Sequence, residues 1–187
     1  MHSIHRELNT PYGVRLLAPA YRTYEERIRG TTTYPPGAKE NGGIFCHANT
    51  WLIVAAAMLG RGDDAYRHYR RILPLARTDA DVFRAEPYVY SQNICGPAHP
   101  QFGMARNAWL TGTAAWAFVA ATQWILGIRP TFDGLRVAPV IPTSWPGFVA
   151  HREFRGVAYE IRVRREGPGG AVTLVVDGRP VPGTVVP

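Results

Sequence analysis

The stretch PPGAKENGGIFCHANTW, residues 35–51, gathers polar side chains and three glycines directly before an apolar run. It contains Lys39, the only lysine of the chain, followed by Glu40. Gly42 and Gly43 allow a tight turn and a close approach of the backbone to a ligand. The chain then enters a predicted helix near His47, whose free N–H groups and dipole favour an anion such as phosphate. A capping or packing histidine and a solvated Lys-Glu turn are the open alternatives.

A second group of the same kind lies in the stretch WLTGTAAW. Thr111, Gly112 and Thr113 stand where another helix is predicted to begin, so a hydroxyl and backbone N–H groups point out of its positive end. Two such helix ends could hold one anion together. The residues alone equally fit a capping threonine followed by a glycine that permits close helix packing.

The stretch EPYVYSQN places aromatic and polar side chains together at Glu86, Tyr88, Tyr90 and Gln92. Aromatic faces beside amide and carboxylate groups are typical of sugar recognition, because a sugar ring has an apolar face and a rim of hydroxyls. Tyrosines at every second position are also ordinary in a strand. By itself this stretch is a weak signal for a sugar site.

Three helices are predicted to position these residues, at 47–59, 63–73 and 109–127, from apolar spacing and from the glycine or proline that ends each. Residues 85–107 have no clean period and are rich in Pro, Gly, Asn and Gln. This composition predicts a long irregular segment of functional importance.

After Gly127 the sequence alternates polar and apolar residues between Asp-Gly and Gly-Gly turns, which predicts antiparallel strands. We therefore expect a mainly α protein with a β tail, divided into residues 1–128 and 129–187. The β part is expected to form a partial sandwich that packs on the helices through three aromatic residues, Trp145, Phe148 and Phe154.

The composition narrows the classes of function. The net charge is +7, but the arginines are scattered and form no basic run, so nucleic acid is not an expected partner. No apolar window is long enough to span a membrane and no signal peptide is recognisable, so we expect a cytoplasmic protein without a membrane partner. Cys46 and Cys95 suit neither a disulfide framework nor a metal site, and both are predicted to be buried thiols.

Several segments taken together resemble the C-terminal portion of the family 94 glycoside phosphorylases, which include the cellobiose, chitobiose and cellodextrin phosphorylases. The segments are YPPGAKENGGIFCHANTW, EPYVYSQN, NAWLTGTAAW, ATQWILGIRPTFDGLRVAPVIPTSW and REFRGVAYEIRV. The resemblance runs in order from about residue 8 to 165. It implies the last helices of an (α/α)6 barrel followed by a C-terminal antiparallel β-sandwich, and thus a truncated or partial protein.

The resemblance also implies the residues of one pocket. The phosphate-binding residues are those of the two predicted helix ends: His47, Thr111 and Gly112. The sugar-binding residues are a matching charged pair and two residues from stretches that line the same pocket: Lys39, Glu40, Tyr34 and Gln92.

The implied reaction is inverting phosphorolysis of a β-linked disaccharide to an α-sugar 1-phosphate. Inorganic phosphate is the co-substrate, and no metal or other cofactor is expected. Phosphate is already anionic, so one carboxylic acid suffices, whereas water would need a second carboxylate as base. The family's general acid is an upstream Asp with no match here, so the isolated chain is expected to be inactive. A homodimer of the full-length enzyme is a further expectation, and a non-catalytic sugar-binding module or an inactive remnant are the alternatives.

Overall fold

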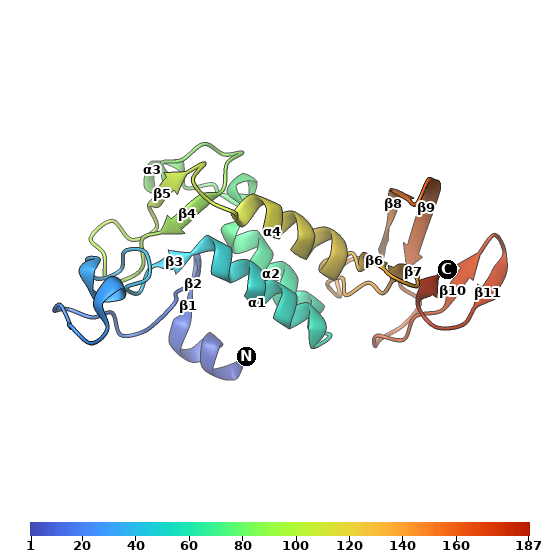
Figure 1. Ribbon diagram of the computed structural model, residues 1–187, viewed down its shortest axis with the longest axis horizontal. Helices are drawn as coiled ribbons and strands as arrows, with labels where there is room; N and C mark the ends of the chain where they lie inside the picture. Colours follow the sequence, from blue (N-terminus) through green and yellow to red (C-terminus); the bar gives the residue numbers. More distant parts are fainter. The chain divides into compact units, whose positions relative to one another are not determined.

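The computed structural model describes residues 1–187, which form two compact units. The first unit consists of Met1–Ile53 with Arg67–Phe118, and the second consists of Val54–Tyr66 with Val119–Pro187. Figure 1 labels their helices and strands. The four α-helices are α1 (Cys46–Met58), α2 (Gly62–Ile72), α3 (Ala80–Phe83) and α4 (Thr113–Val119).

Helix α1 confirms the first predicted helix, and its end has a clear local cause. Gly60 adopts a φ of +70°, a left-handed conformation that glycine reaches without steric cost. The Gly60 N–H donates to the Ala57 carbonyl at 2.9 Å, and the Arg61 N–H donates to the Ala56 carbonyl at 2.9 Å. These two bonds form a Schellman motif, which satisfies the last carbonyls of the helix. Helix α2 likewise confirms the second predicted helix to within one residue at each end.

The third predicted helix is shorter than its apolar pattern indicated. Helix α4 begins at Thr113 and continues as a π-helical turn, Ala120–Ile125. The predicted start at Trp109 is wrong because Trp109 adopts a φ of +72°, which a right-handed helix excludes. The turn that carries Thr111 and Gly112 therefore lies outside the helix.

The first unit also contains short strands, and two of them begin within residues 85–107, which were predicted to be irregular. Strands β3 (Ile44–Phe45), β4 (Ser91–Ile94) and β5 (Ala105–Ala108) form one antiparallel sheet in the order β3-β4-β5. A small hairpin of β1 (Asn9–Thr10) and β2 (Gly13–Val14) precedes them. Strands of two to four residues show too little alternation to be recognised in a sequence.

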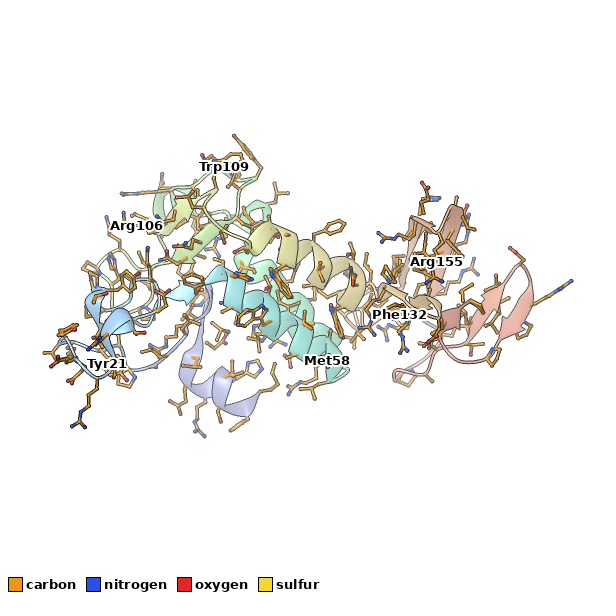
Figure 2. The ribbon with its side chains drawn as sticks, viewed as in Figure 1. Tyr21, Met58, Arg106, Trp109, Phe132 and Arg155 are labelled. Atoms are coloured by element: carbon orange, nitrogen blue, oxygen red, sulfur yellow. The ribbon has the colours of Figure 1, made fainter.

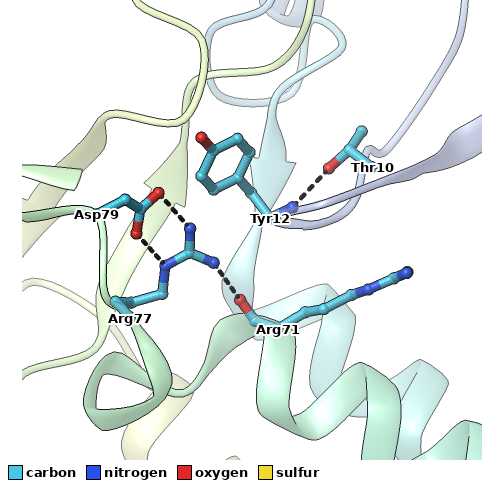
Figure 3. Close-up of polar contacts among 5 residues, drawn as sticks. All are labelled: Thr10, Tyr12, Arg71, Arg77 and Asp79. Atoms are coloured by element: carbon cyan, nitrogen blue, oxygen red, sulfur yellow. Dashed lines mark hydrogen bonds and ion pairs between the residues drawn. The ribbon is translucent and has the colours of Figure 1, made fainter. Parts of the chain in front are cut away.

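A salt bridge within the segment before α3 lies beside Tyr12 of the first hairpin (Figure 3). The Arg77 guanidinium donates to both carboxylate oxygens of Asp79, at 3.1 and 2.7 Å, and lies 4.5 Å from the centre of the Tyr12 ring. Burial acts to raise the pKa of Asp79, but the hydrogen bonds and charge of Arg77 outweigh it, and the pKa is lowered. Arg77 therefore contacts both the Asp79 carboxylate and the face of the Tyr12 ring.

The second unit confirms the predicted antiparallel strands after Gly127. Strands β6 (Ile128–Thr131), β7 (Gly134–Val137) and β12 (Val185–Val186) pair in the order β12-β7-β6. Two hairpins complete this unit, and Figure 1 shows the longer one as β8 and β9. Their strands are β8 (Gly147–Phe154), β9 (Val157–Arg164), β10 (Leu174–Val176) and β11 (Arg179–Val181).

The predicted packing of Trp145 on the helices is also confirmed within this unit. Its ring lies 5.0 Å from the ring of Tyr66 on α2, at an interplanar angle of 66°. Phe148 and Phe154 both lie on β8.

The predicted fold class is wrong. The chain is 30% helical and 26% strand, so it is not mainly α, and it contains neither an (α/α)6 barrel nor a β-sandwich. A sandwich requires two sheets whose inner faces bury each other. Every sheet here has two or three strands, and no residue of β8 or β9 is fully buried.

The remaining sequence predictions concern the thiols and the membrane. Cys46 and Cys95 are both buried free thiols, as predicted. None of the helices in residues 1–187 combines the length and the apolar character that crossing a bilayer requires.

We predict that neither thiol reacts with Ellman's reagent while the chain is folded. Burial raises the pKa of the Cys46 thiol to about 12 and also blocks the approach of the reagent. At pH 8 the reactive thiolate fraction is on the order of 10⁻⁴, against about a quarter for an exposed thiol. The absorbance of released thionitrobenzoate should stay flat in buffer and rise for two thiols per chain in guanidinium chloride. Rapid release of one equivalent without denaturant would contradict this burial.

Candidate functional site

His47 lies in the first turn of α1 and forms a cluster with two indole rings. Its ring centre is 5.5 Å from that of Trp51, one turn further along α1, and 5.8 Å from that of Trp116 on α4. Both tryptophans are partly exposed, at 57% and 42%, yet the Nε2 atom of His47 is buried without a hydrogen-bond partner. Buried polar atoms are nearly always paired, so this unpaired imidazole nitrogen is a candidate for a hydrogen bond to a ligand.

Gly112 faces this imidazole from the turn before α4. A Cβ atom added to Gly112 would lie 3.5 Å from the His47 Cε1 and 3.7 Å from its Nδ1. The adjacent Thr111 shapes this turn, because its Oγ1 accepts a hydrogen bond from the Thr113 N–H at 3.1 Å. The two threonine hydroxyls are 2.6 Å apart, and Thr113 is fully buried. If the Thr113 hydroxyl donates in this pair, the Thr111 proton remains available to a ligand.

Gln92 on β4 is connected to the same turn. Its Nε2 donates to the Leu110 carbonyl at 3.2 Å, and its Oε1 is buried without a partner. The structure therefore brings together four of the predicted site residues, His47, Thr111, Gly112 and Gln92.

The other three predicted residues lie in the loop that precedes β3. The Lys39 Nζ is 5.2 Å from the centre of the Tyr34 ring, within range of a cation–π interaction. Glu40 has a buried carboxylate oxygen, Oε2, without a hydrogen-bond partner. No hydrogen bond, ion pair or ring contact connects these three side chains to His47 or Gln92.

The glycine pair of this loop packs against the chain itself. A Cβ on Gly43 would lie 2.4 Å from the Lys39 carbonyl oxygen, and a Cβ on Gly96 would lie 2.1 Å from that of Gly42. Gly42 also adopts a φ of +78°. These close backbone approaches require glycine at both positions, whether or not a ligand binds.

Sequence reasoning missed Asn41, which holds this loop in place. Asn41 is 1% exposed, and its Oδ1 accepts from the Tyr21 N–H at 2.8 Å. Its Nδ2 donates to the carbonyls of Tyr21 at 2.9 Å and Tyr34 at 2.8 Å. The only sequence signal is a polar residue between a charged pair and two glycines.

Asn49 plays the equivalent part at the start of α1. It is 2% exposed, and its side-chain amide pairs with both backbone groups of Val14, each at 2.8 Å. The Nδ2 also donates to the Phe45 carbonyl at 2.9 Å. The helical turn that carries His47 is thereby fixed to β2 and β3.

Comparison with known proteins gives a consistent set of relatives. Residues 1–127 match the Glycosyl hydrolase 94 superfamily, catalytic domain. The chain is similar to an N,N'-diacetylchitobiose phosphorylase of Vibrio proteolyticus, 42% identical over 192 residues that cover 100% of this chain and 24% of that protein. It is 43% identical to the N,N'-diacetylchitobiose phosphorylase of Vibrio furnissii, covering 97% of this chain and 23% of that protein. A solabiose phosphorylase of Paenibacillus borealis is 37% identical, with 100% and 25% coverage. The chain spans about a quarter of the length of these relatives.

We predict that Asn41→Leu lowers the free energy of unfolding by roughly 3 kcal/mol, since it removes three hydrogen bonds and leaves backbone groups unpaired. Asn41→Asp should also be destabilising, because it keeps the acceptor but loses both donors and buries a charge. Urea denaturation measures both variants. Glu26→Leu, at an exposed position of the same region, is the control and should change stability by less than about 0.5 kcal/mol. Equal stability of Asn41→Leu and the wild-type chain would show that the loop does not depend on this amide.

Proposed function

This chain belongs to the glycosyl hydrolase 94 superfamily, and from this membership we propose that it supplies the phosphate-binding part of a disaccharide phosphorylase active site. The proposed reaction cleaves a β-linked disaccharide with inorganic phosphate, inverts the anomeric carbon and releases an α-sugar 1-phosphate. The names of the relatives, which are phosphorylases of N,N'-diacetylchitobiose and solabiose, support this class of reaction. A cytoplasmic location and a homodimer remain predictions.

The observation that carries the proposal is the unpaired, buried Nε2 of His47 directly beside Gly112. Leaving a buried polar atom without a partner costs free energy, which a hydrogen bond to a phosphate oxygen would recover. The rings of Trp51 and Trp116 lie beside the imidazole, whose Nε2 is itself buried. In such surroundings a charge-assisted hydrogen bond to phosphate is stronger than in water.

The roles of the other phosphate-binding residues follow from their positions. Gly112 has no side chain, and a Cβ added there would lie 3.5 Å from the His47 Cε1, in the region where the anion is proposed to bind. The Thr111 hydroxyl is held in the same turn and is proposed to donate to a second phosphate oxygen. The bound phosphate is an anionic nucleophile already, so these residues need only bind and orient it.

The sugar-binding set, Lys39, Glu40, Tyr34 and Gln92, is proposed to contact the disaccharide. Two of its members, Glu40 and Gln92, have a buried acceptor oxygen without a partner, and sugar hydroxyls are suitable donors for both. The general acid is proposed to come from residues outside this sequence, so the isolated chain should not turn over. We also propose a domain boundary near residue 128, supported by the end of the family match at residue 127.

The product identifies the reaction. An enzyme in which this chain is combined with the polypeptide that supplies the general acid should convert N,N'-diacetylchitobiose or solabiose, with phosphate, to an α-sugar 1-phosphate. Direct attack of phosphate from the face opposite the leaving group inverts the β-linked carbon. Proton NMR of the anomeric signal measures the product, and the isolated chain is the control without turnover. A β-anomer, or turnover by the isolated chain, would contradict the proposed mechanism.

The phosphate site is tested with His47→Ala and Gly112→Ala in the same enzyme. We expect His47→Ala to lower kcat/KM for phosphate on the order of 10²-fold, since it removes a hydrogen bond to an anion in a water-poor site. The methyl of Gly112→Ala would sit in ordinary contact with the imidazole, 3.5 Å from Cε1, so folding should tolerate it. It should raise the phosphate KM with little change in Tm, because Gly112 does not have a left-handed backbone conformation that alanine would strain. Gly30→Ala is the matched control, because nothing lies within 4 Å of its added Cβ.

Thr111→Val separates a structural from a phosphate-binding role of this hydroxyl. Loss of the acceptor for the Thr113 N–H should cost about 1 kcal/mol of stability in either case. A raised phosphate KM is expected only if the hydroxyl also contacts phosphate. Unchanged phosphate KM values in both Thr111→Val and Gly112→Ala would remove this turn from the site.

A further inference from the structure

We infer that Glu86 is a positioning residue of the proposed phosphate-binding turn and acts through Trp109. The inference rests on the proposed function, because it concerns how Gly112 is held against His47. Glu86 itself is not proposed to touch phosphate.

The turn between β5 and α4 carries backbone strain. Asn107 has a φ of +53° and Trp109 a φ of +72°, with only Ala108 between them. Residues other than glycine rarely adopt this backbone conformation, and it persists only where surrounding contacts impose it. The strained residues lie directly before Leu110, Thr111 and Gly112.

Burial does not hold Trp109 in place. Its side chain is 68% exposed, at the periphery of the first unit (Figure 2). The specific contact of the indole is a hydrogen bond from its Nε1 to the Glu86 Oε1, at 3.2 Å. A hydrogen bond from its own backbone amide and this indole bond lower the pKa of Glu86, so the acceptor is ionised at neutral pH.

Two further contacts hold the turn from the same segment. Ser91 on β4 pairs with Ala108 on β5, and the Gln92 side chain donates to the Leu110 carbonyl at 3.2 Å. Residues 86–92 thus contact three successive residues of the strained turn. Loss of the Glu86 contact would let Trp109 relax toward a negative φ and shift the following Gly112 away from His47.

The test follows binding of inorganic phosphate to the full chain by NMR, at the Gly112 backbone amide and the Trp109 indole N–H. Glu86→Leu and Trp109→Phe each remove the hydrogen bond, and we expect the phosphate Kd to rise about three- to tenfold in both. Glu86→Gln keeps a carbonyl acceptor for the indole, so its Kd should stay within about twofold of the wild-type value. This rescue by the conservative variant distinguishes positioning from a general loss of stability.

Asp81→Leu is the matched control, because it removes one exposed carboxylate from α3 in the same part of the chain. It should leave the phosphate Kd unchanged. A wild-type Kd in Glu86→Leu and Trp109→Phe, or an equal rise in Asp81→Leu, would overturn the positioning role alone. No response of the wild-type Gly112 amide to phosphate would overturn the proposed phosphate site and the positioning role with it. If Glu86→Leu does not fold, Trp109→Phe and Glu86→Gln decide the question.

Discussion

Two buried asparagine side chains are the constraint on which the rest of the first unit depends. Each amide pairs with both backbone groups of one distant residue, Asn49 with Val14 and Asn41 with Tyr21. The side-chain amide thereby makes the two hydrogen bonds that the backbone of a neighbouring strand would otherwise make. Because an unpaired buried peptide group costs about 1–3 kcal/mol, these pairs fix the segments around Val14 and Tyr21.

The two amides pair with backbone groups, whereas several side chains of the proposed site have no partner. Asn49 fixes the helical turn that carries His47, and Asn41 fixes the loop that carries Glu40. The backbone there is paired and closely packed through glycines, while polar atoms of His47, Glu40 and Gln92 are buried without partners. This contrast is what a ligand site requires, since a rigid frame must hold groups whose partners arrive with the ligand.

The residues of the proposed phosphate site are brought together by contacts within the first unit. Helix α1 contributes His47 and the turn before α4 contributes Gly112. Gln92 on β4, which is proposed to bind sugar, donates a hydrogen bond to the same turn. The strand pairing of β3, β4 and β5 brings these segments into one sheet and its adjoining helices. The loop that carries Lys39 and Glu40 is held by Asn41 and by a hydrogen bond from the Gly96 N–H, just after β4, to the Gly37 carbonyl at 2.8 Å.

The sequence by itself determined the features that depend on neighbours along the chain. Apolar spacing with a glycine stop predicted α1, and an aspartate cap with a closing proline predicted α2. Alternation with Gly-containing turns predicted the antiparallel strands after Gly127, and the quoted motifs identified the family. The tertiary structure alone decided the fold class, the start of α4 and the contact between His47 and Gly112.

Very short strands have no readable period, and the positive φ of Trp109 goes against its local apolar pattern. The partners of Asn41 and Asn49 lie far away in the sequence, so no local pattern reports them. Periodicity records which face of an element is buried, whereas pairing between distant backbone groups is settled only when the chain folds.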